Sequence, residues 1–338
     1  YQEIIPPLSN FTRPKNDKFI DKNVFHIPHF PHYWFRDRMD GVRRACVGSM
    51  TNDGNCMHVI VENFDYFTVP KTPKRVIRER KRPLGYKESG LFVVEGNSKA
   101  ELLQGLDLLL QHIKKHAEKD TNIESMARSW YQKNSQDYKK ILAVSIIAGD
   151  IVKLGKWISD AKDTVSKDNP IKLNGPDGIK YSPEPLGTSG EIAFIFPGSG
   201  NHYVGMGRSI GVVWPEILRK MDEETLQLKT QLIPQCYIPW GNIWENGWEK
   251  NAHNKIISNP LHMIFGQVAH GGVISNLVRS FSIKPSAVIG YSLGESAGLF
   301  ALEAWPERGN MLERMKASNL FHTELTGPCN AARKVWKI

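Results

Sequence analysis

A serine between two glycines is the residue of this sequence whose type and spacing best suit chemistry. Residues 287–299 are AVIGYSLGESAGL, so Gly290 and Gly294 flank Ser292 in a Gly-x-Ser-x-Gly pattern. Strand-forming residues precede the serine and helix-forming residues follow it, which is typical of a nucleophile on a sharp strand-to-helix turn. The N–H groups at the helix start would stabilise an oxyanion, as acyl transfer and hydrolysis both require.

The same residues also fit a purely structural role. Ser292 and Glu295 have the spacing of a capping box, in which a serine hydroxyl accepts a hydrogen bond from the helix backbone. Many serines begin helices without doing chemistry. The pattern alone therefore leaves both roles open for Ser292.

A glycine-rich turn lies upstream of the serine. Residues 194–208 are FIFPGSGNHYVGMGR and include Gly198-x-Gly200 directly after an apolar run. The turn lacks the third glycine of a dinucleotide-binding loop and the Lys-Ser/Thr pair of a P-loop, so it gives little support to nucleotide binding.

Alternating elements must position these two motifs. We predict a buried strand over 192–196, helical residues to about 230, a helix over 260–281, a strand over 285–291 and a helix over 293–305. Strands that alternate with helices indicate a parallel α/β sheet.

An α+β pattern precedes this region. The segment 97–119 predicts a helix that Ser98 and Glu101 cap, and its leucines form one apolar face. The other predicted elements are strands over 57–64, 90–96 and 140–149, helices over 125–133 and 150–165, and a loop over 174–191.

Composition narrows the class of protein. The 338 residues carry a net charge of +9 and are 41% hydrophobic, and no long apolar run is present. These values indicate a folded chain of about two or three domains without a membrane span. The first residues, YQEIIPPLSN, lack an initiator Met and a signal-peptide pattern, and we expect both ends to be cuts in a longer polypeptide.

Four scattered cysteines, Cys46, Cys56, Cys236 and Cys329, argue against a disulfide scaffold or a zinc ribbon and predict a reducing compartment, the cytoplasm. The basic run within 71–82 has no interleaved aromatic residues, so we do not expect nucleic-acid binding. The three histidines in FHIPHFPHYWF lie among prolines and aromatic residues with no cysteine or acid close by. They predict packing and no metal site.

The two motifs together resemble the acyltransferase domain of type I polyketide and fatty-acid synthases. FPGSGNHYVGMGR and QVAHGGVISNLVRSFSIKPSAVIGYSLGES are similar to that family's FPGQGSQ and GHSxGE motifs. Residues 42–63, VRRACVGSMTNDGNCMHVIVEN, resemble the end of a ketosynthase. This form is similar to the branch that makes polyunsaturated fatty acids or heterocyst-type glycolipids. The residues between 42–63 and the acyltransferase-like motifs resemble the linker that joins ketosynthase to acyltransferase.

The resemblance implies three domains. These are the C-terminal end of a ketosynthase-like domain over 1–68, a small α+β linker domain over 69–190, and the N-terminal part of a hydrolase-like, parallel-sheet acyltransferase domain over 191–338.

The resemblance also implies roles for individual residues. Ser292 would carry the acyl group, and the main-chain N–H groups of Leu293 and His202 would form the oxyanion hole. Tyr291 replaces the family's usual histidine beside the serine, and Tyr291 and Gln267 would bind substrate. The family's general-base histidine would lie beyond residue 338, so we expect little turnover from this segment alone.

Selection of a malonyl group would require an arginine that pairs with the substrate carboxylate. The residues that match this position in GNMLERMKASNLF are Arg314 and Lys316. A charge exposed on a helix face is the alternative for both.

The resemblance implies no tightly bound cofactor. The acyl donor would be a coenzyme A thioester, and the acceptor would be the phosphopantetheine thiol of an acyl carrier protein. Further partners would be other synthase domains of the same polypeptide, with a homodimer through a ketosynthase part as an open alternative.

Two other functions remain open. An α/β-hydrolase-type esterase or thioesterase would place an acid and a histidine after the turn and an HGG-type loop upstream, where this chain has PGSG. A non-catalytic docking fragment of a synthase would fit the altered MTNDGNCMHV segment.

Overall fold

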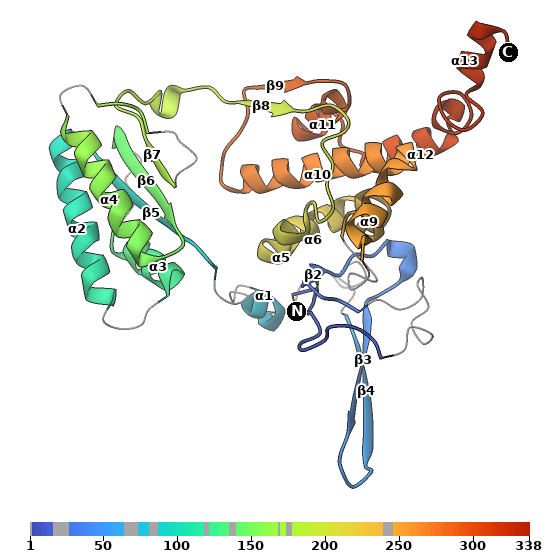
Figure 1. The fold of residues 1–338 in the computed structure, drawn as a ribbon, viewed down its shortest axis with the longest axis horizontal. Coiled ribbons are helices and arrows are strands. Elements are labelled where there is room, and N and C mark those ends of the chain that lie inside the picture. Colours follow the sequence, from blue (N-terminus) through green and yellow to red (C-terminus); the bar gives the residue numbers. More distant parts are fainter. Residues whose placement is uncertain are drawn as a thin grey trace. The chain divides into compact units, whose positions relative to one another are not determined.

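The computed structural model describes residues 2–15, 27–63, 74–80, 87–117, 122–134, 140–167, 170–173, 178–238 and 246–338. The chain forms two compact units, one of residues 83–190 and one that combines residues 1–82 with 191–338. Both units mix helices with small sheets, which confirms the predicted α/β class (Figure 1). Across the described residues, no helix has both the length and the apolar composition needed to cross a membrane.

The unit of residues 83–190 is a three-stranded antiparallel sheet with helices on one face. Its strands are β5 (Gly90–Gly96), β6 (Leu142–Ala148) and β7 (Ile179–Tyr181), in the order β5-β6-β7. Figure 1 shows α2 (Lys99–Ala117) and α4 (Ile151–Ser166) side by side on this sheet, and α3 (Ile123–Lys133) packs on β5. Alternate strand residues therefore point into one core, whose fully buried members include Phe92, Leu106, Ile146 and Ile158.

Of two sequence predictions for the unit of residues 83–190, one is confirmed and the other is partly wrong. The predicted cap forms, because the Ser98 hydroxyl accepts the Glu101 N–H at 3.2 Å and the Glu101 carboxylate accepts the Asn97 N–H at 3.0 Å. The predicted loop over 174–191 is wrong at β7, whose three residues pair with β6. A strand this short between Gly- and Pro-containing segments carries too little periodicity to be recognised.

The second unit contains a parallel pair of strands, as the sequence predicts. β8 (Ala193–Phe196) pairs with β9 (Ala287–Gly290), so that Phe196 lies opposite Gly290. The helices of this unit are α5 (Arg208–Val213), α6 (Pro215–Glu224), α7 (Leu228–Leu232), α8 (Pro234–Tyr237), α9 (Trp248–Ile257), α10 (Pro260–Ser280), α11 (Leu293–Ala301), α12 (Arg308–Ala317) and α13 (Asn330–Trp336).

The helices cover one face of this strand pair. α11 packs on both strands, and the ring of Phe196 lies against Gly271 of α10. On the opposite face Ile195 is 73% exposed and Ile289 is 59% exposed. The prediction that 192–196 is a buried strand is therefore wrong for one face, because no described element covers it.

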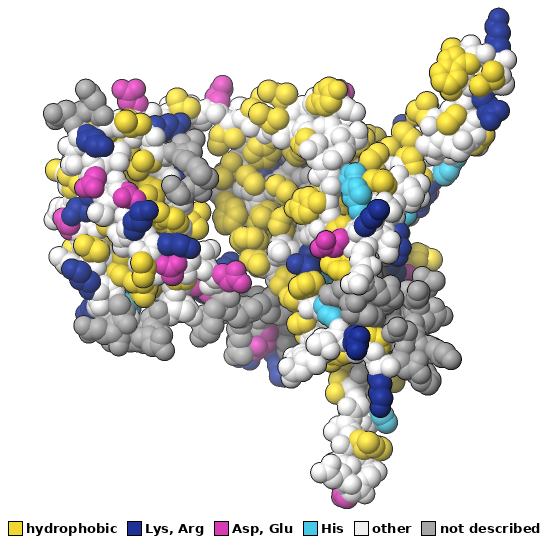
Figure 2. All heavy atoms as spheres, in the orientation of Figure 1, with side chains coloured by type: hydrophobic (Ala, Val, Ile, Leu, Met, Phe, Trp, Pro, Cys, Tyr) yellow, Lys and Arg dark blue, Asp and Glu magenta, His cyan; other side chains and the backbone are white. Residues whose placement is uncertain are grey.

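The N-terminal segment belongs to this second unit. β1 (Ile4–Ile5) and β2 (His32–Tyr33) pair with each other, and the buried Tyr33 packs against Leu218 and Met221 of α6. A short helix, α1 (Lys74–Arg80), follows the hairpin of β3 (Arg44–Met50) and β4 (Cys56–Glu62). Hydrophobic side chains show on the outside of this hairpin and of α13 in Figure 2.

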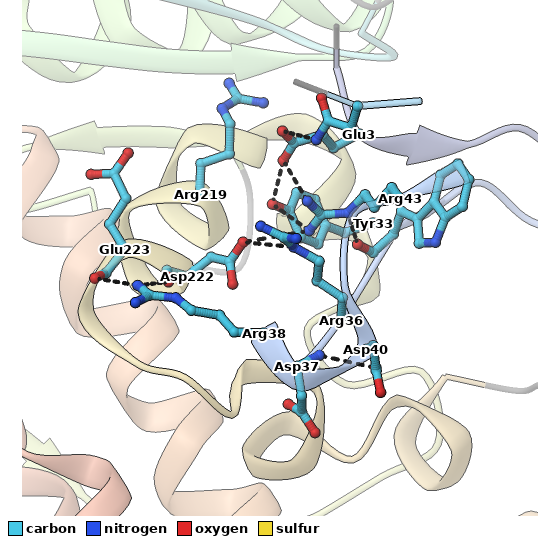
Figure 3. Close-up of polar contacts among 12 residues, drawn as sticks. Glu3, Tyr33, Arg36, Asp37, Arg38, Asp40, Arg43, Arg219, Asp222 and Glu223 are labelled. Atoms are coloured by element: carbon cyan, nitrogen blue, oxygen red, sulfur yellow. Dashed lines mark hydrogen bonds and ion pairs between the residues drawn. The ribbon is translucent and has the colours of Figure 1, made fainter. Parts of the chain in front are cut away.

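A buried ion-pair cluster joins the N-terminal segment to α6 (Figure 3). The Arg43 side chain lies 3.7 Å from the Glu3 carboxylate and 3.6 Å from the Asp222 carboxylate. Its Nε donates to the Trp34 carbonyl at 2.6 Å and its Nη2 donates to the Tyr33 hydroxyl at 3.5 Å. Arg43 thus contacts buried acceptors from both parts of the unit.

The charges in the cluster compensate one another. Burial opposes the charge on Glu3, but Arg43, the Tyr33 hydroxyl and Arg80 outweigh it and hold the pKa of Glu3 below its ordinary value. Burial raises the pKa of Asp222 despite Arg43 and Arg36 nearby. Removal of one arginine should therefore leave buried negative charge without enough compensation.

We expect Arg43→Met to lower the free energy of unfolding of this unit by about 3 kcal/mol, because it leaves two buried carboxylates undercompensated. The neighbouring Arg44→Met is a matched control. Arg44 pairs with Glu62 at 2.6 Å, but the two side chains are 62% and 52% exposed, so its loss should cost less than about 1 kcal/mol. Chemical denaturation of both variants measures the difference, and equal losses would contradict the role of the cluster.

Candidate active site

The glycine-rich turn and the serine turn leave the same end of the parallel strand pair. β8 and β9 end at Phe196 and Gly290, which are register partners. Tyr291 then donates its N–H to the Phe196 carbonyl at 3.2 Å. The two motifs, far apart in the sequence, therefore begin side by side at one edge.

Ser292 occupies a strained and exposed position on this edge. Its backbone has φ 55° and ψ −115°, a conformation that L-residues other than glycine rarely adopt. The residue is exposed, and α11 begins at the next residue. Backbone strain of this kind is found most often at functional sites, where the surrounding structure holds it in place.

The Ser292 hydroxyl does not cap the helix. It accepts no hydrogen bond from the first turn of α11, whereas Ser98, in the same Ser-x-x-Glu spacing, accepts one from Glu101. Within the described residues the Ser292 hydroxyl has no hydrogen-bonding partner at all. The structural alternative that the sequence left open is therefore not realised at Ser292.

The flanking glycines are required by contact with main-chain atoms. A side chain at Gly290 would collide with the main chain of Gly294 and Glu295, and one at Gly294 would collide with the Phe196 carbonyl. α11 thus approaches the strand ends more closely than a residue with a Cβ allows. The Gly-x-Ser-x-Gly pattern permits this close approach, because it places a glycine at both contact positions.

The glycine-rich turn touches the residue before the serine. Gly198 is buried, and a Cβ there would lie 2.7 Å from the Tyr291 ring and 3.1 Å from its carbonyl oxygen. The side chain of Gln267 in α10 donates its Nε2 hydrogens to the carbonyls of Gly198 and Pro197, the latter at 3.4 Å. Gln267, which the family resemblance assigns to substrate, is thus bonded to the turn.

Both predicted oxyanion donors are free to bind. The main-chain N–H groups of Leu293 and His202 have no acceptor among the described residues. The His202 ring stacks on His253 of α9, with centroids 5.2 Å apart and planes inclined by 19°. Burial, followed by the neighbouring His253, lowers the pKa of His202.

The remaining predicted site residues are exposed. The Tyr291 side chain is 78% exposed beside the serine. Arg314 and Lys316 lie on the exposed surface of α12, where Lys316 pairs with Glu313 at 3.8 Å and Arg314 has no ion pair with a described residue. Arg314 is therefore the freer of the two to bind a carboxylate.

A serine–histidine contact occurs in the unit of residues 83–190. Nε2 of the buried His112 lies 3.0 Å from the Ser129 hydroxyl and 3.3 Å from the Met126 carbonyl. The Ser129 hydroxyl donates to the Met126 carbonyl at 3.0 Å, so its proton is directed to the main chain of its own helix. This contact joins α2 to α3.

Two contacts of the site could not be predicted from the sequence. The stacking of His253 on His202 joins a turn to α9, and no spacing pattern signals it. The bonds from Gln267 to the turn also join distant segments. Across the described ranges, no three His, Cys, Asp or Glu side chains are close enough to hold a metal ion.

The chain is similar to fungal polyketide synthases. It is 22% identical over 300 residues to atrochrysone carboxylic acid synthase of Passalora fulva, a match that covers 88% of this chain and 14% of that protein. It is 24% identical over 302 residues to highly reducing polyketide synthase AFT9-1 of Alternaria alternata, which covers 88% and 8%. The chain thus spans a small part of these relatives. No family model matches it.

The chain is also distantly similar to solved structures. The acyl transferase domain of ZmaA matches with a TM-score of 0.44 and 18% identity, over 68% of this chain and 50% of that one. A ketosynthase from module 6 of the bacillaene synthase of Bacillus subtilis matches with a TM-score of 0.21 over 53% and 25%.

The two Ser-x-x-Glu serines should respond differently to mutation. We expect Ser98→Ala to lower the free energy of unfolding by about 1 kcal/mol, because it removes a cap. Ser292→Ala should cost less than about 0.5 kcal/mol, since no cap is lost, and Ser292→Gly should stabilise by about 1 kcal/mol by relieving strain. Chemical denaturation measures all three. A loss for Ser292→Ala as large as that for Ser98→Ala would show that the hydroxyl caps α11.

Proposed function

We propose that this chain carries part of an acyltransferase in which Ser292 transfers acyl groups from coenzyme A to a carrier protein. The observation that supports this most strongly is the geometry of Ser292, exposed at a positive φ between a strand and a helix, with no cap bond. The free N–H groups of Leu293 and His202 add to it. The similarity to polyketide synthases supports the same reaction class.

The reaction is an exchange of thioester for ester and back. The Ser292 oxygen attacks the thioester carbonyl, the carbon–sulfur bond breaks, and coenzyme A leaves as a thiol with the serine proton. The phosphopantetheine thiol of an acyl carrier protein then attacks the serine ester and regenerates Ser292. In both steps the Leu293 and His202 N–H groups would hold the negative oxygen.

Serine requires a base to be a strong nucleophile. No histidine ring bonds to the Ser292 hydroxyl within the described residues. As the family resemblance implies, we propose a histidine for that role.

The proposed context is a multidomain synthase. Residues 1–68 would end a ketosynthase-like domain, 69–190 would form the linker, and 191–338 would begin the acyltransferase. In the structure, residues 1–82 and 191–338 form one compact unit. The ion-pair cluster around Arg43 joins these two segments. The branch that makes polyunsaturated fatty acids or heterocyst-type glycolipids stays a prediction from MTNDGNCMHV alone.

The acyl-enzyme provides the test of this function. We expect intact mass spectrometry of the full-length protein, after incubation with acetyl- or malonyl-coenzyme A, to show one acyl adduct on Ser292. Ser292→Ala should abolish it, and Ser296→Ala, one helical turn further along α11, should not. An adduct that persists in Ser292→Ala, or no adduct in the parent, would contradict the proposal.

Arg314 gives a test of substrate selection. If its guanidinium pairs with a free carboxylate, Arg314→Ala should lower the rate of malonyl loading by about tenfold or more and leave acetyl loading nearly unchanged. Lys316→Ala, whose side chain already pairs with Glu313, should affect neither rate. Equal losses of malonyl and acetyl loading in Arg314→Ala would remove this role.

A further inference from the structure

We infer that Gln267 is a positioning residue that orients the N–H groups of Gly198 and Ser199 toward the oxyanion formed on Ser292, as donors additional to the main-chain N–H groups of Leu293 and His202. This inference rests on the proposed acyl transfer and concerns how its oxyanion hole is built. Gln267 lies in the middle of α10 and is 7% exposed. It makes no contact with Ser292 that would give it a direct chemical role.

The hydrogen bonds of Gln267 hold two peptide groups in one orientation, and the Asn201 side chain, which donates to the Gly198 carbonyl at 3.0 Å, supports one of them. Its Nε2 donates to the carbonyl oxygens of Pro197 and Gly198. In a trans peptide the N–H points opposite to the C=O. The N–H groups of Gly198 and Ser199 therefore point away from α10.

These N–H groups have no acceptor among the residues that the structure describes. None of the main-chain N–H groups of Gly198, Ser199, Gly200 and His202 donates to an acceptor in the part of the chain that the structure describes. Gly198 is itself buried, and buried N–H groups are almost always paired with an acceptor. A run of aligned, unpaired N–H groups is a site for an anion.

The turn lies where this anion would form. Gly198 is in contact with Tyr291, the residue before Ser292. The Leu293 N–H, on the other side of the serine, is also without an acceptor among described residues. Unpaired donors thus come both from the turn that packs on the residue before Ser292 and from the residue that follows it.

Gln267 disfavours the opposite orientation of these two peptide groups. If either peptide turned over, its N–H would face the Nε2 donor, and its carbonyl would take the side of the turn away from α10, where the inference places the oxyanion. The Oε1 atom of Gln267 is buried without a hydrogen-bonding partner. The contacts that hold this side chain therefore run through its Nε2, which bonds to the turn.

Substitution with glutamate tests the direction of these bonds. Gln267→Glu keeps the shape but replaces the donor with acceptors that repel the two carbonyls. Gln267→Met keeps the volume and removes the donor. We expect both to lower the rate constant of Ser292 acylation by about 100-fold at neutral pH, with half-saturation by acyl-coenzyme A changed less than about twofold.

The pH dependence distinguishes positioning from a general loss of structure. A buried glutamic acid has a raised pKa, and its protonated form can again donate to a carbonyl. The acylation rate of Gln267→Glu, relative to the parent, should therefore recover as the pH falls, while that of Gln267→Met should not.

The matched control is Gln231→Glu. Gln231 in α7 is 1% exposed, donates its Nε2 to the Thr225 hydroxyl at 2.9 Å, and also has an unpaired Oε1. It should lose stability without the selective loss of acylation rate. The inference is overturned if Gln267→Glu and Gln231→Glu slow acylation equally, or if Gln267→Glu changes only half-saturation. Absence of any Ser292 adduct in the parent would instead overturn the proposed function itself.

Discussion

The close approach of α11 to the ends of β8 and β9 is the constraint on which this site depends. Main-chain atoms of Phe196, Gly294 and Glu295 occupy the space that side chains at 290 and 294 would need. Since β9 ends at Gly290 and α11 begins at Leu293, the backbone has only Tyr291 and Ser292 in which to reverse direction, and Ser292 takes φ 55°. The exposed hydroxyl and the free Leu293 N–H both follow from this reversal.

Contacts between segments that are distant in the sequence hold the glycine-rich turn beside the serine turn. The parallel pairing of β8 with β9 brings the glycine-rich turn beside the serine turn, and Gln267 ties that turn to α10. The Arg43 cluster joins the N-terminal segment to α6 in the same unit. These are buried polar contacts, for which incomplete pairing is costly, so they favour one arrangement over nearby alternatives.

Local patterns in the sequence predict the elements well where periodicity is long. The segment 97–119 and its Ser98 cap predict α2, which spans Lys99–Ala117. Gly-x-Ser-x-Gly predicts the strand, turn and helix around Ser292. The same local pattern could not decide whether Ser292 caps its helix, because Ser98 and Ser292 share the Ser-x-x-Glu spacing, while only Ser292 has a positive φ.

Contacts between distant segments could not be predicted. Glu3, Arg43 and Asp222 meet through tertiary packing, and no spacing of residues signals their cluster. The exposure of Ile195 likewise depends on what covers the sheet, not on the apolar run that contains it. β7 is too short for its three residues to show alternation.

The most direct test of the central claim is an experimental structure of the protein with a phosphonate ester on Ser292, a stable analogue of the tetrahedral intermediate. We predict a phosphonyl oxygen within about 2.7–3.1 Å of the Leu293 nitrogen and of one main-chain nitrogen from the turn at 198–202. A phosphonyl oxygen directed into solvent, with the serine at a negative φ and its side chain bonded to the first turn of α11, would contradict it.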